Sequence, residues 1–481
     1  MTINTRVLRS LLILWIAGGL VPFLHGANTA AAEEATLSSP GADLPAGWWA
    51  AAQGSIAEDM SVSNLQGLSQ NPDWSAVGAD GGDEFGFSVA GVGDVNGDGY
   101  ADVMVGAPGF ATLVGQGKAY AFYGSPAGLS TVPDWEAYGV GNGGFGYAVA
   151  AAGDVNGDGY ADVVVSSPLY GAQPGRIYIY YGSPSGLSSD DVWLGEGGYD
   201  GDHFGISVAG AGDVNGDGYA DVIAGANYDG EDFTGSACVY HGSATGPGTS
   251  CDWSVEGESD YFYLGYSVTG AGDVNGDGYA DVAISSMVYF EGRGIVYVYM
   301  GSSGGLETSP DWTKMGENAG DWFGRSVAGA GDLNGDGFSD LAVGADGYYV
   351  QDGNDGKVYV FYGSRDGLAH TEDVWYRGLV PSQEDRVGRS VASAGDVNGD
   401  GYADLVIGAT ERAKVLYGAA EGLNNGWPDW WPWSENDGDK FGYAVTGAGD
   451  VNGDGYADVM VGAQGYLAGA DQGKAYVYHG A

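Results

Sequence analysis

The nonapeptide Asp-Val-Asn-Gly-Asp-Gly-Tyr-Ala-Asp stands at residues 94–102 and recurs six more times in a chain of 481 residues. Only one copy departs from this wording, and its Leu333, Phe338 and Ser339 leave every Asp and the Asn in place. The further copies occupy 154–162, 213–221, 273–281, 332–340, 396–404 and 450–458. Repetition at such regular intervals indicates one assembly built from seven similar units.

The nonapeptide crowds oxygen donors onto a tight turn. Positions one, three, five and nine carry side-chain oxygens, and Gly at positions four and six lets the backbone turn sharply and present the carbonyl of position seven. Hard oxygen donors in this arrangement favour Ca²⁺. A simple Asn-Gly-Asp-Gly turn would account for one or two acidic residues. It does not account for three carboxylates in every copy, because neighbouring carboxylates repel one another unless a cation neutralises them. An EF-hand does not fit, because position twelve is apolar, as at Val105.

We therefore expect up to seven structural Ca²⁺ ions and no other cofactor. In each copy the expected ligands are the side chains at positions one, three, five and nine and the carbonyl at position seven. They are Asp94, Asn96, Asp98, Tyr100 and Asp102; Asp154, Asn156, Asp158, Tyr160 and Asp162; Asp213, Asn215, Asp217, Tyr219 and Asp221; Asp273, Asn275, Asp277, Tyr279 and Asp281; Asp332, Asn334, Asp336, Phe338 and Asp340; Asp396, Asn398, Asp400, Tyr402 and Asp404; and Asp450, Asn452, Asp454, Tyr456 and Asp458.

Each repeat unit has room for four strands. In the third unit, residues 204–209, 221–226 and 236–241 alternate or run apolar as strands do, and a fourth strand starts near Trp253. Seven such units predict an all-β, seven-bladed β-propeller of four-stranded blades. The last unit ends after its third strand, while an extra Gly67-Leu68 and Trp74 precede the first unit. We therefore expect the N-terminal segment to supply the outer strand of the last blade.

Phe-Gly pairs and a Gly-Ala-Pro triplet accompany the nonapeptide. The pairs stand at 85–86, 145–146, 204–205, 323–324 and 441–442, and the triplet at 106–108. Together they resemble the FG-GAP repeats of the integrin α-subunit propeller over roughly residues 60–481. The resemblance implies a seven-bladed propeller with loop calcium on its lower face and a role in extracellular recognition or adhesion. Leu264 and Val387 depart from the pattern by replacing Phe.

The N-terminal region has the layout of a secretory signal peptide. Arg6 and Arg9 precede an apolar stretch, and small residues follow up to Ala32. We expect a signal peptide at 1–32, a flexible linker at 33–60 and the propeller at 61–481, which predicts a secreted or cell-surface protein. The alternative is an uncleaved anchor, which the short apolar run disfavours.

The net charge of the chain disfavours some classes of binding partner. Sixteen Lys and Arg against 64 Asp and Glu give a formal net charge of −48, which disfavours binding to nucleic acid or insertion into an anionic membrane. No integrin leg region follows the propeller, so an integrin β-type partner is also disfavoured. The only two cysteines, Cys238 and Cys251, flank an outer hairpin and form a candidate disulfide in an oxidising compartment.

The search for chemistry finds no catalytic residue. The histidines share no repeat position in this interpretation, and the serine-nucleophile, zinc-protease and phosphate-loop motifs are absent. Any ligand site is expected in the loops that vary between units, on the face opposite the nonapeptides. Aromatic residues there form the candidate ligand face, although local packing explains them equally well: Tyr170, Tyr228, Tyr289, Tyr348, Tyr349 and Tyr466.

Two functions follow from this sequence. The first is a non-enzymatic adhesion or protein-recognition module stabilised by calcium, with an extracellular protein or glycan as its ligand. The alternative is a carbohydrate-binding lectin or a polysaccharide-degrading enzyme on a calcium propeller. The scarcity of basic residues that would serve a lyase favours binding over catalysis.

Overall fold

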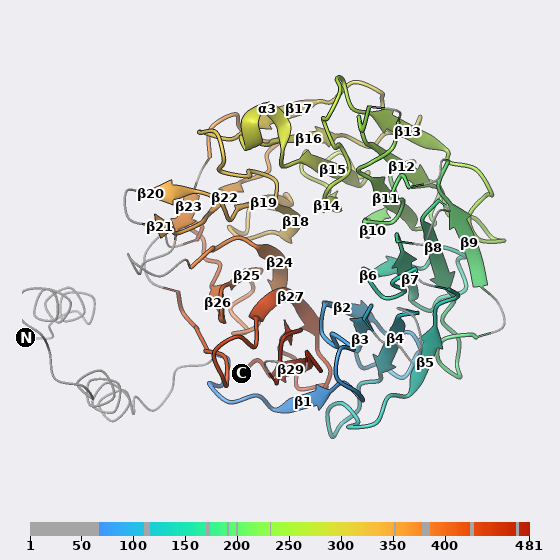
Figure 1. Ribbon diagram of the computed structural model, residues 1–481, viewed down its shortest axis with the longest axis vertical. Helices are drawn as coiled ribbons and strands as arrows, with labels where there is room; N and C mark the ends of the chain where they lie inside the picture. The colour runs from blue at the N-terminus through green and yellow to red at the C-terminus, as the bar shows by residue number, and fades with distance from the viewer. Residues whose placement is uncertain are drawn as a thin grey trace, which may run out of the picture. The chain divides into compact units, whose positions relative to one another are not determined.

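Seven β-sheets of three or four strands follow one another around a ring as the blades of a propeller (Figure 1). The computed structural model describes residues 67–109, 116–141, 143–169, 174–189, 192–198, 201–230, 232–350, 353–372, 374–377, 385–423, 428–467 and 471–481. These residues belong to a compact unit that runs from Leu65 to Ala481. The expected signal peptide and linker lie outside the described residues.

Each blade starts with an inner strand and works outward through antiparallel neighbours. Blade one contains β2 (Ser88–Gly93), β3 (Asp102–Ala107), β4 (Lys118–Phe122) and β5 (Trp135–Tyr138); blade two contains β6 (Val149–Gly153), β7 (Asp162–Ser167), β8 (Arg176–Tyr180) and β9 (Val192–Glu196); blade three contains β10 (Ser207–Gly212), β11 (Asp221–Ala226), β12 (Ser236–Tyr240) and β13 (Trp253–Glu256); blade four contains β14 (Val268–Gly272), β15 (Asp281–Ser286), β16 (Ile295–Tyr299) and β17 (Trp312–Met315).

The remaining three blades repeat this order with additions and one loss. Blade five contains β18 (Ser326–Gly331), β19 (Asp340–Ala345), β22 (Lys357–Phe361) and β23 (Val374–Arg377), and its β19–β22 connection carries β20 (Tyr349–Val350) and β21 (Gly353–Asn354); blade six contains β24 (Ser390–Gly395), β25 (Asp404–Ala409) and β26 (Arg412–Leu416); blade seven contains β27 (Phe441–Gly449), β28 (Asp458–Ala463), β29 (Lys474–Tyr478) and β1 (Trp74–Val77).

The ring closes as the sequence predicts. The N-terminal strand β1 pairs with β29, so Trp74 lies opposite Val477 and Val77 opposite Lys474. The indole of Trp74 packs edge-on against Phe122 of blade one at 4.9 Å and donates a hydrogen bond to the Ser130 carbonyl. Because β1 pairs with β29, that strand is paired on both sides, and its edge is not left open at the seam.

Blade six departs from the expected four strands. Its outer position is occupied by isolated bridges from Trp430 to Val415 and from Trp433 to Arg412 instead of a continuous strand. Pro428 and Pro432 stand in this segment, and proline has no N–H to donate to a ladder. Trp430 is nevertheless buried and packs against Tyr478 at 4.8 Å, so the packing role expected of the repeated Trp is kept.

The core lies between blades. The second strand of every blade is buried along its whole length, as in β3 and β11. The residue before the repeated Gly reaches back to the preceding blade, where Phe145 forms a bridge with Gly117. Leu264 and Val387, which replace Phe, form the same kind of bridge and are fully buried. A smaller apolar side chain therefore fills the same interblade position.

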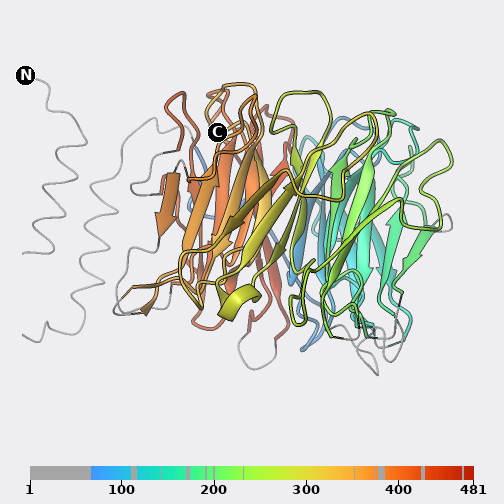
Figure 2. The ribbon, with the colours of Figure 1, turned by 90° about the horizontal axis from the view of Figure 1, so that it is seen from above.

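The two faces of the ring differ in what they carry. Inner strands end in the nonapeptides on one face, and the variable β-connections lie on the other. Figure 2 shows the short helical turn α3 (Tyr289–Gly292) on the lower side as drawn, away from the marked C-terminus. The described part of the chain contains no helix with the length and apolar character needed to span a bilayer.

Candidate metal loops and recognition face

The nonapeptide folds by turning its own carboxylates inward onto its backbone. In the first copy Asp94 Oδ1 accepts the N–H of Asp98, and Asp94 Oδ2 accepts the N–H of Gly99 at 2.8 Å. Asn96 Oδ1 accepts the same Asp98 N–H at 2.9 Å, and Asp98 Oδ1 accepts that of Tyr100. The same four bonds recur in all seven copies.

The Asp at position nine has a different environment. Asp102 is buried, and its two oxygens accept the N–H groups of Val95 and Gly124. Burial raises the pKa of Asp102 to about 7, and nearby Asp98 and Asp94 add to this, while the two backbone hydrogen bonds oppose it. A carboxylate held in this way gains from a neighbouring cation.

Adjacent loops are joined into a closed belt. The N–H of Ala161 donates to the Asp94 carbonyl of the preceding loop, and the ring of Tyr160 lies over Gly97. A Cβ added to Gly97 would lie 2.5 Å from Tyr160 Cε1, and the φ of Gly97 is +73°. Gly453 of the last loop meets Tyr100 of the first in the same way. The glycine at position four and the aromatic ring at position seven therefore also join neighbouring loops. The sequence predicted only a turn at position four and a carbonyl ligand at position seven.

The donor set of each loop suits a hard cation. Every proposed ligand is oxygen, and the glycine at position six, such as Gly99, has open space around it. Among the described residues, however, no group of three or more His, Cys, Asp or Glu side chains is gathered closely enough to hold a metal ion. Binding would need the carboxylates at positions one, five and nine to share a centre in addition to their backbone hydrogen bonds.

The opposite face carries an aromatic cluster at the junction of blades three and four. We define it by His203, Tyr228, Phe233, Tyr261 and Tyr263. Ring centroids are 4.4 Å apart for His203 and Tyr228 and 5.2 Å for Tyr228 and Tyr263. Tyr261 is 61 % exposed. Four of the five residues have positive φ, between 55° and 58°, a conformation that costs an L side chain roughly 1–2 kcal/mol.

The expected ligand-face tyrosines are not equivalent. Tyr228 and Tyr349 are exposed, whereas Tyr289 packs against Phe262 at 4.8 Å. Tyr348 and Tyr466 are half-buried and lie near the buried ammonium groups of lysines in their own blades. Tyr170 lies outside the described residues. The aromatic cluster is therefore distinguished by its rings being in mutual contact, and the sequence pointed to it only through its aromatic content.

The axis of the ring holds a cavity of about 230 Å³ on this same face. The residue after each repeated Gly lines it, which places Phe87, Tyr147, Tyr266 and Tyr443 together with Arg325 and Arg389. Arg389 stacks over Tyr443 at 4.2 Å, and Arg325 lies 3.8 Å from buried Asp346. The sequence analysis did not predict this set of cavity-lining residues, because the position after the repeated Gly holds different residue types in different blades.

The structure tests the predictions made for the cysteines and the histidines. Cys238 and Cys251 are joined by a disulfide across the β12–β13 hairpin. His241 and His479 occupy one repeat position, directly after the third strand, where each backbone N–H donates to an Asp of the outer segment. The prediction that the histidines share no repeat position is therefore wrong for this pair. The other blades have Tyr or Met at that position, so comparing residue types between repeats did not reveal the shared position of the two histidines.

The sheet order and the seven loops define a propeller of the integrin α type. The model of the FG-GAP repeat matches residues 85–122, 145–180, 204–240, 264–299, 323–361, 387–419 and 441–478, more than half of the chain. The chain belongs to the FG-GAP repeat family.

Curated relatives include both integrins and an enzyme. Human integrin alpha-6 is 38 % identical over 147 residues, which is 30 % of this chain and 12 % of that protein. Integrin alpha-PS2 of Drosophila melanogaster is 32 % identical over 220 residues, covering 42 % of this chain and 15 % of that protein. The phosphatidylinositol-glycan-specific phospholipase D of Bos taurus is 34 % identical over 208 residues, covering 37 % and 24 %. The chain thus matches only a small part of each relative.

Proposed function

We propose that the protein is a non-enzymatic recognition module that binds an extracellular protein through the face opposite the nonapeptides. The FG-GAP family membership and the integrin relatives support this at the level of a recognition fold. We further propose that residues 1–32 direct export, that 33–60 form a linker, and that the seven loops each hold one structural Ca²⁺. Position-nine carboxylates such as Asp102 and Asp162 would gain most from the ion.

The aromatic cluster carries the proposal. A belt of seven near-identical loops offers a partner no distinctive feature, whereas His203, Tyr228, Phe233, Tyr261 and Tyr263 occur at one place in the ring. His203 and Tyr263 share their positive φ with the residue before the repeated Phe-Gly in other blades, such as Glu84 and Trp322. Tyr261 lies outside that position and combines a positive φ with 61 % exposure. Aromatic rings with a polar tip are enriched at protein interfaces.

Replacing Tyr261 and Tyr228 by Ala tests the recognition face. We expect the double variant to lose at least about tenfold in affinity for a captured partner, because large aromatics at the centre of an interface contribute most of its energy. Binding is measured on parallel arrays of extracellular proteins and glycans, with Trp375→Ala as a control for an exposed aromatic of an outer strand.

Each array result has a defined meaning. Protein capture that is lost in the double variant and kept in Trp375→Ala supports the proposal. Capture that survives the double variant would contradict it. Capture of glycans alone would favour the lectin alternative, which the same aromatic cluster suits.

A further inference from the structure

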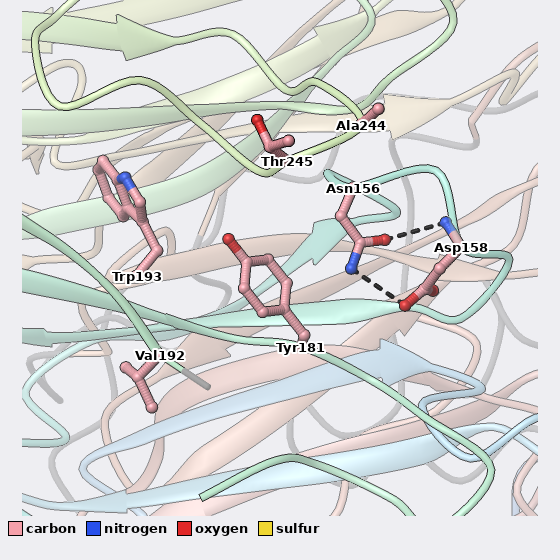
Figure 3. Close-up of a pocket in the computed structure, with 7 residues that line it drawn as sticks. All are labelled: Asn156, Asp158, Tyr181, Val192, Trp193, Ala244 and Thr245. Carbon is pink, nitrogen blue, oxygen red and sulfur yellow. Dashed lines mark hydrogen bonds between the residues drawn. The ribbon is translucent and has the colours of Figure 1, made fainter. Parts of the chain in front are cut away.

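A second cavity lies between blades two and three on the nonapeptide side of the ring. Its volume is about 370 Å³, and Figure 3 shows Tyr181, Trp193 and Thr245 around a common space, with Asn156 and Asp158 at one side. Tyr181 follows β8, Trp193 belongs to β9, and Thr245 comes from the β12–β13 turn of the next blade. The cavity is therefore an interblade site, remote from the recognition face.

The cavity arises from one departure from the repeat. In six turns a leucine follows the glycine and is buried against the outer part of the neighbouring blade; these residues are Leu68, Leu129, Leu187, Leu306, Leu368 and Leu423. The turn in blade three has Pro247 instead. Proline is shorter than leucine, so the space next to Trp193 is only partly filled.

Trp193 is left uncovered as a result. Five tryptophans at the same register position are at most 8 % exposed, namely Trp74, Trp135, Trp253, Trp312 and Trp430, whereas Trp193 is half-buried. Trp375 of blade five stands one residue out of this register, because Val374 is the residue opposite Val360. Its indole leans over Gly195, where a Cβ would lie 2.7 Å from the ring. Its Nε1 donates to the Gly248 carbonyl at 3.1 Å, which holds the indole beside the cavity.

Pro247 also changes the polar chemistry of the site. The N–H groups of Leu187 and Leu423 donate to the hydroxyl groups of Tyr123 and Tyr362 at 2.9 and 2.8 Å. Proline has no N–H, so the corresponding bond to Tyr181 cannot form. The phenol of Tyr181 and the indole of Trp193 thus line the same cavity. At the six Gly-Leu turns the buried leucine occupies the corresponding space.

We propose that this cavity binds a single neutral pyranose unit of a glycan. An aromatic face packs against the C–H face of a sugar ring, and the hydroxyl groups of Tyr181 and Thr245 can donate to and accept from its hydroxyl groups. Asn156 and Asp158 are hydrogen-bonded to each other and border the cavity as part of the nonapeptide. None of the described residues that line the cavity is Lys or Arg, which disfavours an anionic ligand.

Titration with methyl glycosides tests the site on the full-length chain. The probes are the methyl glycosides of glucose, galactose, mannose, fucose and N-acetylglucosamine, read by isothermal titration calorimetry and ligand-observed NMR with and without Ca²⁺. We expect at least one probe to bind with a dissociation constant on the order of 1 mM. Pro247→Leu inserts the residue that six other turns already accommodate, so it should keep the fold and weaken binding by at least about tenfold.

Two further variants make the result decisive. Trp193→Ala should also weaken binding at least about tenfold, and Trp375→Ala, an exposed tryptophan elsewhere, should leave it unchanged. Absence of binding for all five probes would overturn the proposal, and so would binding that Pro247→Leu leaves intact. Either failure would leave the recognition face untouched, because the two sites lie on opposite faces.

Discussion

Excess EDTA is expected to lower the midpoint of thermal unfolding of the full-length chain by roughly 10–20 °C. A ligand at about 100 times its dissociation constant stabilises the folded state by about 2.7 kcal/mol per site, and the chain has seven loops to release. Unfolding a domain of this length has a large entropy, so each kcal/mol shifts the midpoint by only about 1 °C. Differential scanning calorimetry measures the shift.

The physical reason lies in the crowded loops. Without a cation, Asp94, Asp98 and Asp102 repel one another, and burial already raises the pKa of Asp102. Asp98→Asn keeps an oxygen for the Tyr100 N–H but removes one charge, so it should reduce the EDTA-sensitive shift by about one seventh of the total. EDTA saturated with Ca²⁺ beforehand is the control. An unchanged midpoint in free EDTA would contradict structural calcium.

Asp385→Ala is expected to destabilise the protein by about 3–5 kcal/mol. Asp385 is fully buried between two cations, with Arg412 Nε 3.1 Å from its Oδ1 and Lys414 Nζ 2.8 Å from its Oδ2. Burial lowers the pKa of Lys414, and Asp385 is the neighbour that opposes this. Removing the carboxylate leaves two buried cations without this anion, beside the rings of Trp433 and Tyr376.

Urea denaturation of Asp385→Ala beside a variant of a pair whose carboxylate is exposed measures this cost. Glu136 pairs with Lys118 at 2.6 Å but is 43 % exposed, so Glu136→Ala should cost less than about 1 kcal/mol. Both variants remove one carboxylate from a buried lysine, but Asp385 is itself buried and also faces Arg412, whereas Glu136 is exposed. Equal losses for the two variants would show that the buried cluster of blade six does not stabilise the fold in this way.

Much of the architecture was predictable because it repeats. The nonapeptides count the blades, and Trp74 ahead of the first unit revealed the closing strand that pairs with β29. Short continuous apolar runs located the second strands well because these strands are buried along their whole length. Blade six was predicted less well, since prolines near Trp430 interrupt the ladder without removing the buried indole.

The candidate sites were less predictable because they depend on departures from the repeat. Pro247 is one residue in a turn, and its effect on Trp193 becomes visible only when two blades are placed side by side. The aromatic cluster joins Tyr228 to Tyr263, which come from different loops. Asp385 and Lys414 are separated by a whole hairpin. No local pattern reports such contacts, which arise from the packing of neighbouring blades.

The calcium content of the purified chain tests the central claim most directly. The full-length protein is equilibrated with Ca²⁺, passed through a desalting column into metal-free buffer, and analysed by inductively coupled plasma mass spectrometry against protein concentration. The nonapeptide in each of the seven blades predicts a ratio of about seven Ca²⁺ per chain. A ratio near zero would contradict the claim that these loops are metal sites.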